Sequence, residues 1–580
     1  MRFGAEKSRE SMTNCHRNAV LGYAEATCEE TFKEGLRPQI EVDVWTIAEI
    51  PESREFRPEV SSRMGSVTPP AEAGDFETRL FINGKVRILP ISDCWTVCRF
   101  SFNPDTFHRV QFVEAKSTNR LSIYSANDNS LISSDVHVAG QADVDDAVAA
   151  ARAAFSSWAS TPPIQRCKLL LRLADLIEEN AEELGRLEAL CSGKPLSQTR
   201  QFEVPLAANV FRYYAGWCDK LEGESWPADN GFMKVVRREP LGVCAAVNAF
   251  NGPLVMIAFK GAPCLAAGNT MVMKSSEKTP LSTIFFGKLL QQAEIPPGVF
   301  NLLSGAGETG ALLASHMDVD KISFTGSVNT GKKIAVAAAS SNLKRVTLEL
   351  GGKSPSIVFP DANLDVATQW CVQGIVGNSG QACIASSRVY VHKDIREAFV
   401  QRLKTAFEQS HAAFGKDPRS DSTHIGPLVD KSQFEKVTQY VEAGKAEATL
   451  ITGGQALYDQ GCWMTPTIFL DPVPDAKIYR EEIFGPVVVV SDFSTEEDVI
   501  HRANATTFGL SGAVFTQDVN RAMRVASQIT SGTVCVNCCT MVDYTVPFGG
   551  LKQSGWGREL GKAGIQAYTE LKTVFINLTY

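Results

Sequence analysis

The sequence lacks any uninterrupted apolar run near the ~20 residues that a membrane-spanning helix needs. It has no excess of basic charge either, since 57 Lys and Arg stand against 65 Asp and Glu for a net charge of −8. A general basic surface for nucleic acid or anionic lipid is therefore excluded. The first ten residues are charged and polar, without the apolar core of a secretory signal. These absences favour a cytoplasmic enzyme with a small-molecule substrate and neither nucleic-acid nor membrane partners.

What is present is ordinary for a globular protein, with 44% hydrophobic and 21% charged residues in a chain of 580. At about 150 residues per domain, this length allows two to four domains. Fifteen cysteines in a chain without a secretory signal are typical of reduced intracellular thiols.

Two segments differ from the rest. Residues 1–63 are rich in charge and weak in apolar periodicity, and Met64 resembles a fresh N-terminus, so this extension is either a disordered tail or the product of a misplaced gene start. Val86–Gln111 separates the strand-and-turn pattern of residues 81–85 from Phe112-Val113, which would continue it smoothly. These 26 residues fit a retained in-frame intron, a hypothesis that transcript sequencing would test.

From about residue 142 the patterning is that of an α/β protein. Val144, Val148 and Ala151 recur with the period of a helix, and helical patterning resumes over 164–191. Five short apolar runs, separated by helix-length segments, follow at 243–247, 270–273, 299–303, 321–324 and 346–350. This alternation predicts a doubly wound parallel sheet. A second α/β region is predicted after Gly352, with strands at 387–391 and 487–490 and a final extended strand over 569–578.

Two glycine patterns lie in the first of these regions. Residues 305–310 match the G-x-G-x-x-G fingerprint of dinucleotide-binding folds, although on the third run of the sheet rather than the first. Residues 326–333 nearly match a P-loop, but Lys333 replaces the hydroxyl residue that holds Mg²⁺. A P-loop NTPase is therefore the alternative from another class, whereas a dinucleotide bound at this helix start needs no metal.

Three other residues are candidates for cofactor binding or catalysis. Glu277, just beyond the apolar run that Lys274 follows, can accept hydrogen bonds from ribose hydroxyls and would repel a 2′-phosphate; the alternative is a surface ion pair. Glu349 places a carboxylate in an apolar strand, where burial raises its pKa and suits it to general base catalysis, unless it is a buried ion-pair partner. Cys383 lies among small residues, so a substrate can approach its thiol, while most other cysteines are expected to fill the core.

These residues belong to motifs that resemble the NAD(P)-dependent aldehyde dehydrogenase superfamily over essentially the whole of 64–580 apart from the insertion. The motifs are, in order, Ala249-Phe250-Asn251-Gly252-Pro253, Phe324-Thr325-Gly326-Ser327, Leu348-Glu349-Leu350-Gly351-Gly352-Lys353, Gly380-Gln381-Ala382-Cys383, Glu481-Glu482-Ile483-Phe484-Gly485-Pro486 and Pro547-Phe548-Gly549-Gly550. The resemblance implies an α/β fold with three parts. They are a Rossmann-type NAD-binding domain (64–217 and 241–351), a catalytic domain (352–561) and a small bridging β-element (218–240 and 562–580). This last element implies a homodimer or homotetramer.

The resemblance also implies a role for each site residue. Cys383, as thiolate, attacks the aldehyde carbon, and the oxyanion accepts hydrogen bonds from the Asn251 side chain and the Cys383 backbone N–H. Hydride passes to NAD, NADP being less favoured, and Glu349 activates the water that releases the acid. No metal is required. The expected cofactor contacts are Lys274, Glu277, Gly305, Gly326, Ser327, Gly331, Glu482 and Phe484.

The predicted substrate tunnel departs from that of many relatives that oxidise small aldehydes. Gly252 and Gly377 replace aromatic residues, Val542 occupies a third such position, and Phe259 and Phe548 remain aromatic. The lost ring volume predicts a bulky, aromatic or polyketide-derived aldehyde, unless neighbouring loops refill the space. A catalytically inactive member that binds NAD without turnover is the remaining alternative, although all required groups are present.

Overall fold

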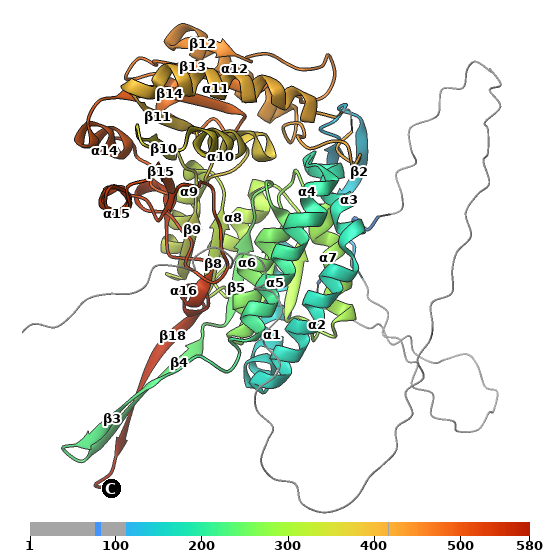
Figure 1. Cartoon of the computed structure of the whole chain (residues 1–580). Helices are drawn as coiled ribbons and strands as arrows, with labels where there is room; N and C mark the ends of the chain where they lie inside the picture. The colour runs from blue at the N-terminus through green and yellow to red at the C-terminus, as the bar shows by residue number, and fades with distance from the viewer. Residues whose placement is uncertain (1–75, 83–111, 416) are drawn as a thin grey trace, which may run out of the picture. The chain divides into compact units, whose positions relative to one another are not determined.

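Two large sheets with helices on their faces make up most of the computed structural model, which describes residues 76–82, 112–415 and 417–580 (Figure 1). These described residues belong to one compact unit, Glu72–Tyr580. The extension over residues 1–63 and the segment Val86–Gln111 lie outside the described residues, so both hypotheses about them stay predictions.

The first large sheet has six strands in the order β17-β9-β8-β5-β6-β7. Its five parallel strands are β5 (Val243–Val247), β6 (Thr270–Lys274), β7 (Phe300–Leu303), β8 (Lys321–Thr325) and β9 (Arg345–Glu349), with β17 (Gly555–Trp556) antiparallel at one edge. The connecting helices are α6 (Pro253–Ala266), α7 (Leu281–Gln292), α8 (Gly307–Ser315) and α9 (Val328–Ser340). The predicted doubly wound α/β fold is confirmed, and it explains why these strands are continuous apolar runs: helices bury both faces.

A helical layer from the N-terminal half packs beside this sheet. It contains α1 (Gln141–Ser160), α2 (Pro163–Glu179), α3 (Ala181–Ser192), α4 (Leu196–Gln198), a π-helical turn η1 (Thr199–Glu203) and α5 (Val204–Ala215), preceded by the hairpin β1 (Arg120–Tyr124) and β2 (Leu131–His137). The helical patterning predicted over 164–191 forms two helices, α2 and α3. Asn180 ends α2 because its side-chain amide donates to the carbonyl of Leu176 at 2.8 Å and its backbone leaves the helical region.

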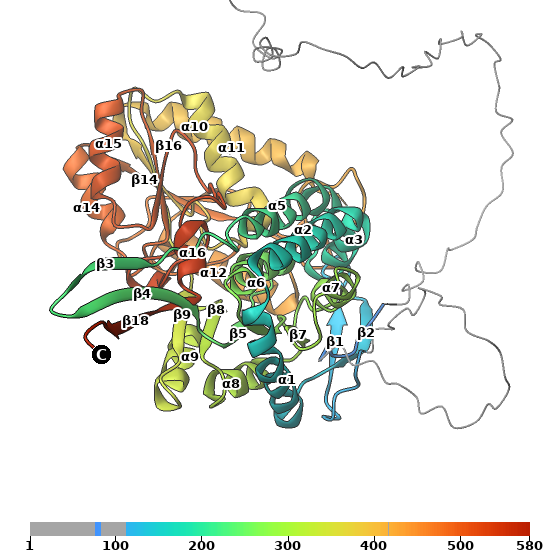
Figure 2. The same cartoon turned by 90° about the horizontal axis from the view of Figure 1, so that it is seen from below.

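The second large sheet has seven strands in the order β12-β13-β14-β11-β10-β15-β16. Figure 2 shows the molecule from below and labels β14 and β16 of this sheet. Its strands are β10 (Pro355–Val358), β11 (Arg388–His392), β12 (Thr449–Thr452), β13 (Thr467–Leu470), β14 (Val487–Phe493), β15 (Ser511–Phe515) and β16 (Thr533–Val536). The longer helices around it are α10 (Leu364–Val376), α11 (Arg396–Gln409), α12 (Lys431–Glu447), α14 (Glu496–Asn504) and α15 (Val519–Gln528). Short turns of helix complete this half: η2 (Gly377–Gly380), η3 (Lys393–Ile395), η4 (Ser410–Ala413), α13 (Lys477–Arg480), η5 (Lys552–Ser554) and α16 (Gly561–Gln566).

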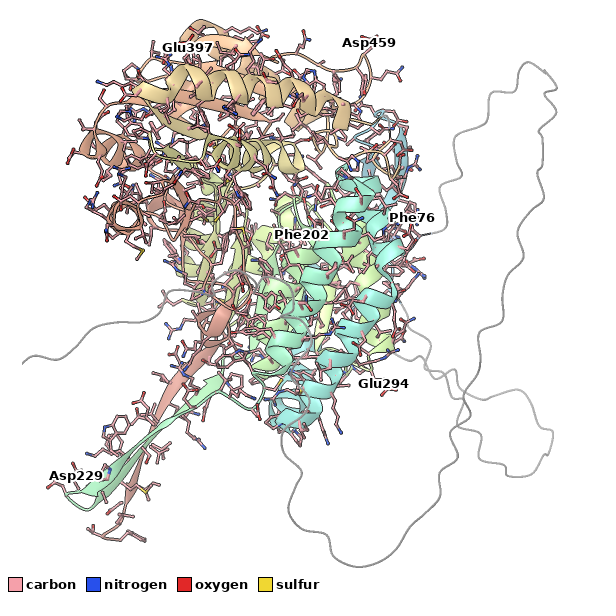
Figure 3. The ribbon with its side chains drawn as sticks, viewed as in Figure 1. Phe76, Phe202, Asp229, Glu294, Glu397 and Asp459 are labelled. Atoms are coloured by element: carbon pink, nitrogen blue, oxygen red, sulfur yellow. The ribbon has the colours of Figure 1, made fainter. Side chains whose placement is uncertain are left out.

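A three-stranded antiparallel sheet joins distant parts of the chain. It contains β3 (Glu224–Asp229), β4 (Phe232–Pro240) and the C-terminal β18 (Thr569–Asn577). Figure 1 shows this sheet extending away from the larger sheets, and Figure 3 labels Asp229 at its far end. Apolar side chains along it are exposed: Trp226, Phe232, Leu571, Phe575 and Ile576.

The described residues on either side of Val86–Gln111 are paired. Leu80 and Val113 exchange both backbone hydrogen bonds, at 3.0 and 2.8 Å, and the rings of Phe81 and Phe112 are 5.6 Å apart. If the 26 residues were absent, this pairing would place Ile82 opposite Lys85 across Asn83-Gly84. That is the register of a two-residue hairpin, in which hydrogen-bonded and non-hydrogen-bonded pairs alternate.

Candidate active site

A cavity of about 370 Å³ lies at the carboxyl ends of β5, β6, β8 and β9, which is where doubly wound sheets bind ligands. Nine of the residues predicted from the sequence line it: Asn251, Lys274, Glu277, Gly326, Ser327, Glu349, Cys383, Glu482 and Phe484. Residues separated by up to 233 positions therefore meet at one cavity.

The start of α9 forms one wall of the cavity. Ser327 caps the helix, accepting a hydrogen bond from Thr330 N at 3.3 Å, and both Gly326 and Ser327 line the cavity. Free N–H groups at such a helix start suit a phosphate. Gly331 does not line the cavity, since the place of a Cβ there is filled by the Leu350 side chain. Lys332 donates to Gln553 Oε1 at 3.2 Å, away from the position that the lysine of a P-loop needs.

Lys274 is the last residue of β6, Glu277 follows three residues later, and both line the cavity. The buried Lys274 Nζ donates to the carbonyl of Gly305 at 2.7 Å and lies 3.5 Å from Glu277 Oε2. The Glu277 side chain is 42% exposed and lines the cavity, so it is available to a ligand. Gly305 itself does not line the cavity, although its neighbours Ala306 and Gly307 do.

Glu349 ends β9 with its side chain in the cavity. It is only 3% exposed, and neither of its carboxylate oxygens has a hydrogen-bond partner among the described residues. Burial raises its pKa well above the ordinary value, and the nearby carboxylate of Glu559 raises it further. A carboxylate without hydrogen-bond partners among the described residues and with a raised pKa is a stronger base than an ordinary carboxylate.

Cys383 follows η2, in which Asn378 and Ser379 hold left-handed backbone conformations at φ 49° and 52°. The thiol is half-buried, and burial together with the carboxylates of Glu482 and Glu349 raises the pKa of Cys383 to about 12. The backbone N–H groups of Cys383 and Ile384 face the sulfur and counteract this effect only in part. The thiolate expected from the sequence therefore requires a base that removes the proton of Cys383.

Asn251 is held against the loop of Cys383. Its side-chain Nδ2 donates to the carbonyl of Gln381 at 3.0 Å, and its own carbonyl accepts from Asn378 Nδ2 at 3.3 Å. An amide nitrogen has two hydrogens, so one remains to donate to a ligand in the cavity.

Gly351 and Gly352, which precede Lys353, let the Glu482 carboxylate and the Cys383 carbonyl lie close to their backbone. A Cβ on Gly351 would lie 2.1 Å from Glu482 Oε2, and a Cβ on Gly352 would lie 2.2 Å from the carbonyl oxygen of Cys383. Glu482 accepts from Gly352 N at 3.1 Å, and burial raises its pKa to about 7. Only glycine fits at either position of this pair.

Phe484 lies beside Glu482 in a left-handed conformation, at φ 59°. Its ring packs edge-on against Phe250 at 5.6 Å, and its carbonyl accepts from Gln433 Nε2 at 2.8 Å. Gln433 and Lys436, both on α12, also line the cavity. Neither residue was predicted from the sequence, because no motif surrounds them.

A second set of residues was missed behind Glu349. Lys260 Nζ is paired with Glu559 and donates to Thr325 Oγ1 at 2.8 Å, while Ser323 Oγ donates to Glu559 at 3.2 Å. Lys260 and Glu559 both act electrostatically on Glu349. A lysine on the otherwise apolar helix α6 was the signal that could have identified this network.

The predicted tunnel residues lie in two places. Phe259, Val542 and Phe548 belong to or pack against one apolar cluster, together with Val255. A Cβ on Gly252 would meet only Val255, at 3.6 Å, and one on Gly377 would meet nothing within 4 Å. Gly377 also borders a cleft of about 740 Å³ between α10 and α11. A Cβ at either glycine therefore has no close contact among the described residues, and the refilling of the remaining ring volume by loops stays an open alternative.

The cavity fits a dinucleotide. It offers a capped helix start for a phosphate, an accessible carboxylate for a ribose, and at its far end a thiol beside an unpartnered carboxyl group. Within the described ranges, no group of three or more His, Cys, Asp or Glu side chains could hold a metal ion. Nor does any helix there have the length and apolar character to cross a membrane.

Comparisons with known proteins agree with this geometry. The profile of the "Aldehyde dehydrogenase family" matches residues 112–574. An aldehyde dehydrogenase of Alternaria alternata is 46% identical over 471 residues, covering 81% of this chain and 94% of that protein. Human retinal dehydrogenase 2 is 45% identical over 449 residues, covering 77% and 86%. The NAD⁺ complex of an aldehyde dehydrogenase from Bacillus cereus has a TM-score of 0.80 at 39% identity and covers 87% of this chain and 97% of that one.

The fold and the matches define an NAD(P)-dependent oxidoreductase of aldehydes. The chain belongs to the aldehyde dehydrogenase family. It oxidises an aldehyde to the corresponding carboxylic acid.

Proposed function

We propose that the protein oxidises a bulky aldehyde with NAD through a covalent adduct on Cys383. The observation that carries this proposal is the single cavity lined by Cys383, Asn251 and Glu349 together with the start of α9. A nucleophile, an amide donor and a base then face one bound carbonyl group beside a phosphate site.

The first step requires that Cys383 lose its proton, because the pKa of its thiol is raised to about 12. Glu349 is the base for this proton, since its carboxyl group lines the same cavity without a partner. The sulfur then bonds to the aldehyde carbon, and the carbonyl oxygen accepts hydrogen bonds from Asn251 Nδ2 and Cys383 N. One such donor contributes about 3–4 kcal/mol to the transition state.

When bound, NAD would supply the acceptor for the hydride that leaves the thiohemiacetal carbon as the Cys383 thioester forms. Glu349 first passes the proton taken from Cys383 to solvent, and we propose the buried Glu559–Lys260 pair behind it as the route. Glu349 then removes a proton from water, and the resulting hydroxide attacks the thioester carbon. When the C–S bond breaks, the carboxylic acid is released and Glu349 returns its proton to the Cys383 sulfur. Glu482 and Phe484 would orient the nicotinamide ribose, Lys274 and Glu277 would bind the adenosine ribose, and Gly326 and Ser327 would hold the pyrophosphate.

NAD is proposed as the preferred cofactor because of Glu277. Its carboxylate accepts hydrogen bonds from a ribose diol, and it would face the negative charge of a 2′-phosphate in NADP. Among the described residues, Glu277 is paired with Lys274, whose Nζ also donates to the carbonyl of Gly305 at 2.7 Å.

The substrate is proposed to be bulky, in line with the lack of close contacts around a Cβ at Gly252 or Gly377 among the described residues. One of the relatives named above is a retinal dehydrogenase. An aromatic or polyketide-derived aldehyde would occupy the volume that aromatic side chains would take at these two positions.

The sheets support a division into an NAD-binding domain around the six-stranded sheet, a catalytic domain around the seven-stranded sheet and a bridging element formed by β3, β4 and β18. The exposed apolar side chains of this last sheet favour a homodimer or homotetramer.

The test follows NADH absorbance with a panel of aldehydes. Cys383→Ala should abolish aldehyde-dependent NADH formation while NAD binding persists. Glu349→Gln should allow at most a small burst of NADH in the first turnover and then stop, because hydrolysis lacks its base. Full steady-state turnover by Cys383→Ala would refute the covalent route.

A further inference from the structure

A buried group of three charged side chains lies directly behind the loop that carries Asn251. Lys194 Nζ is 2.7 Å from each carboxylate oxygen of Glu203 and 3.3 Å from Oε2 of Glu188. Lys194 and Glu188 are each 1% exposed, and Glu203 is 6% exposed. Burying such charges is costly, and one amine does not neutralise two carboxylates. The arrangement is therefore a poor way to gain stability alone.

The other oxygen of Glu188 binds the start of α6. Glu188 Oε1 accepts from Leu254 N at 3.0 Å and from Ser282 Oγ, near the start of α7, at 2.8 Å. Because Pro253, the first residue of α6, has no N–H, Leu254 provides the first donor of this helix. A carboxylate there satisfies that donor and also interacts favourably with the positive end of the helix.

Asn251 lies between this helix start and the catalytic loop. Gly252 is the N-terminal cap of α6, and its carbonyl accepts from Met256 N at 2.9 Å. On the other side, the Asn251 side chain donates to Gln381 O. Glu188 thus anchors the backbone three residues after Asn251, while Lys194 occupies Oε2 and leaves Oε1 directed at Leu254.

We propose that Glu188, oriented by Lys194, is a positioning residue that fixes the Asn251 amide toward the reacting carbonyl oxygen. This inference rests on the proposed role of Asn251 as a donor to the oxyanion. Glu188 does not line the cavity and acts only through the helix start. A donor that is already in place when charge develops stabilises the transition state more than one that must first be ordered.

The test compares three variants by kcat, KM and unfolding temperature. Glu188→Ala removes the acceptor at Leu254 N and should lower kcat about tenfold with little change in KM, because a transition-state interaction is weakened. Glu188→Gln keeps an oxygen for Leu254 N but loses the charge facing Lys194, so its unfolding temperature should fall while kcat is largely retained. Ser282→Ala is the matched control: it removes the other hydrogen bond to Oε1, and kcat should stay within about twofold of the parent protein.

A double-mutant cycle with Asn251→Ala decides between positioning and general stabilisation. If Glu188 acts through Asn251, adding Glu188→Ala to Asn251→Ala should cost little further kcat. Losses that multiply would overturn the inference, as would an unchanged kcat for a folded Glu188→Ala protein while Asn251→Ala is impaired. An unchanged kcat for Asn251→Ala would instead refute the proposed oxyanion role itself, and the positioning role with it.

Discussion

Removing Val86–Gln111 should strengthen the pairing between Leu80 and Val113. In the full chain, 32 residues (81–112) separate the two paired residues, and without the segment only six would remain. The entropy of closing a loop changes as (3/2)RT ln n, so the shorter connection favours the pair by about 1.5 kcal/mol. The Asn83-Gly84 dipeptide is moreover the preferred sequence for such a turn.

Hydrogen exchange measures this local effect directly. The amide hydrogens of Leu80 and Val113, which are both bonded across the pair, should exchange about tenfold more slowly in the shortened protein. The amide of Ile322, in the middle of β8, serves as an internal reference and should not change.

A deletion that is one residue shorter, Val86–Val110, provides the control. It leaves Gln111 in place and shifts the pairing by one residue, so that Phe112 would face Leu80 and the side chains would point to the wrong faces. Protection should then fall below that of the exact deletion. Equal protection in both shortened proteins, or no gain in either, would refute the argument from register.

Three other predictions concern the cavity. Because the pKa of Cys383 is raised to about 12, its alkylation by iodoacetamide in the protein without cofactor should be slow at pH 7 and rise about tenfold per pH unit through pH 10. Mass spectrometry of the labelled Cys383 peptide measures this rate, and a rate that stops rising below pH 9 would contradict the prediction. Glu277→Gln should raise the ratio of kcat/KM for NADP to kcat/KM for NAD about tenfold, and Lys278→Gln serves as a control at the neighbouring position. An unchanged ratio in Glu277→Gln would remove the argument for NAD. Gly377→Phe should lower kcat/KM for a bulky aromatic aldehyde about tenfold or more relative to acetaldehyde. Gly377→Ala is the control and should have little effect, since a Cβ there meets nothing within 4 Å. Equal losses for both aldehydes in Gly377→Phe would argue against a role of this position in size selection.

The parts of the fold that can be predicted from the sequence are those in which burial requires apolar residues. The run predicted at 243–247 is β5 residue for residue, because a strand covered on both faces must be apolar throughout. The break at Asn180 escaped prediction, since it depends on a side chain bonding to a carbonyl four residues earlier, within a continuous helical pattern.

From the sequence, a residue of the site could be predicted only where it lies in a recognisable motif. Glu349 and Cys383 stand out locally, as an acid in an apolar strand and a thiol among small residues. Gln433 and Lys436 reach the cavity from α12, a surface helix whose sequence resembles many others. The raised pKa of the Cys383 thiol comes first from burial and then from Glu482, which is 99 residues away in sequence, so only the folded chain reveals it.

Glu349 carries a consequence for the evolution and engineering of this enzyme. A carboxyl group that is 3% exposed and has no hydrogen-bond partner among the described residues is a weak point of the fold, and an apolar side chain of similar size would suit that place better. Selection for heat resistance alone would therefore be expected to discard this residue early. Its retention lowers the stability of the fold but keeps the base that catalysis needs. Variants selected only for a high melting temperature should therefore also be tested for turnover.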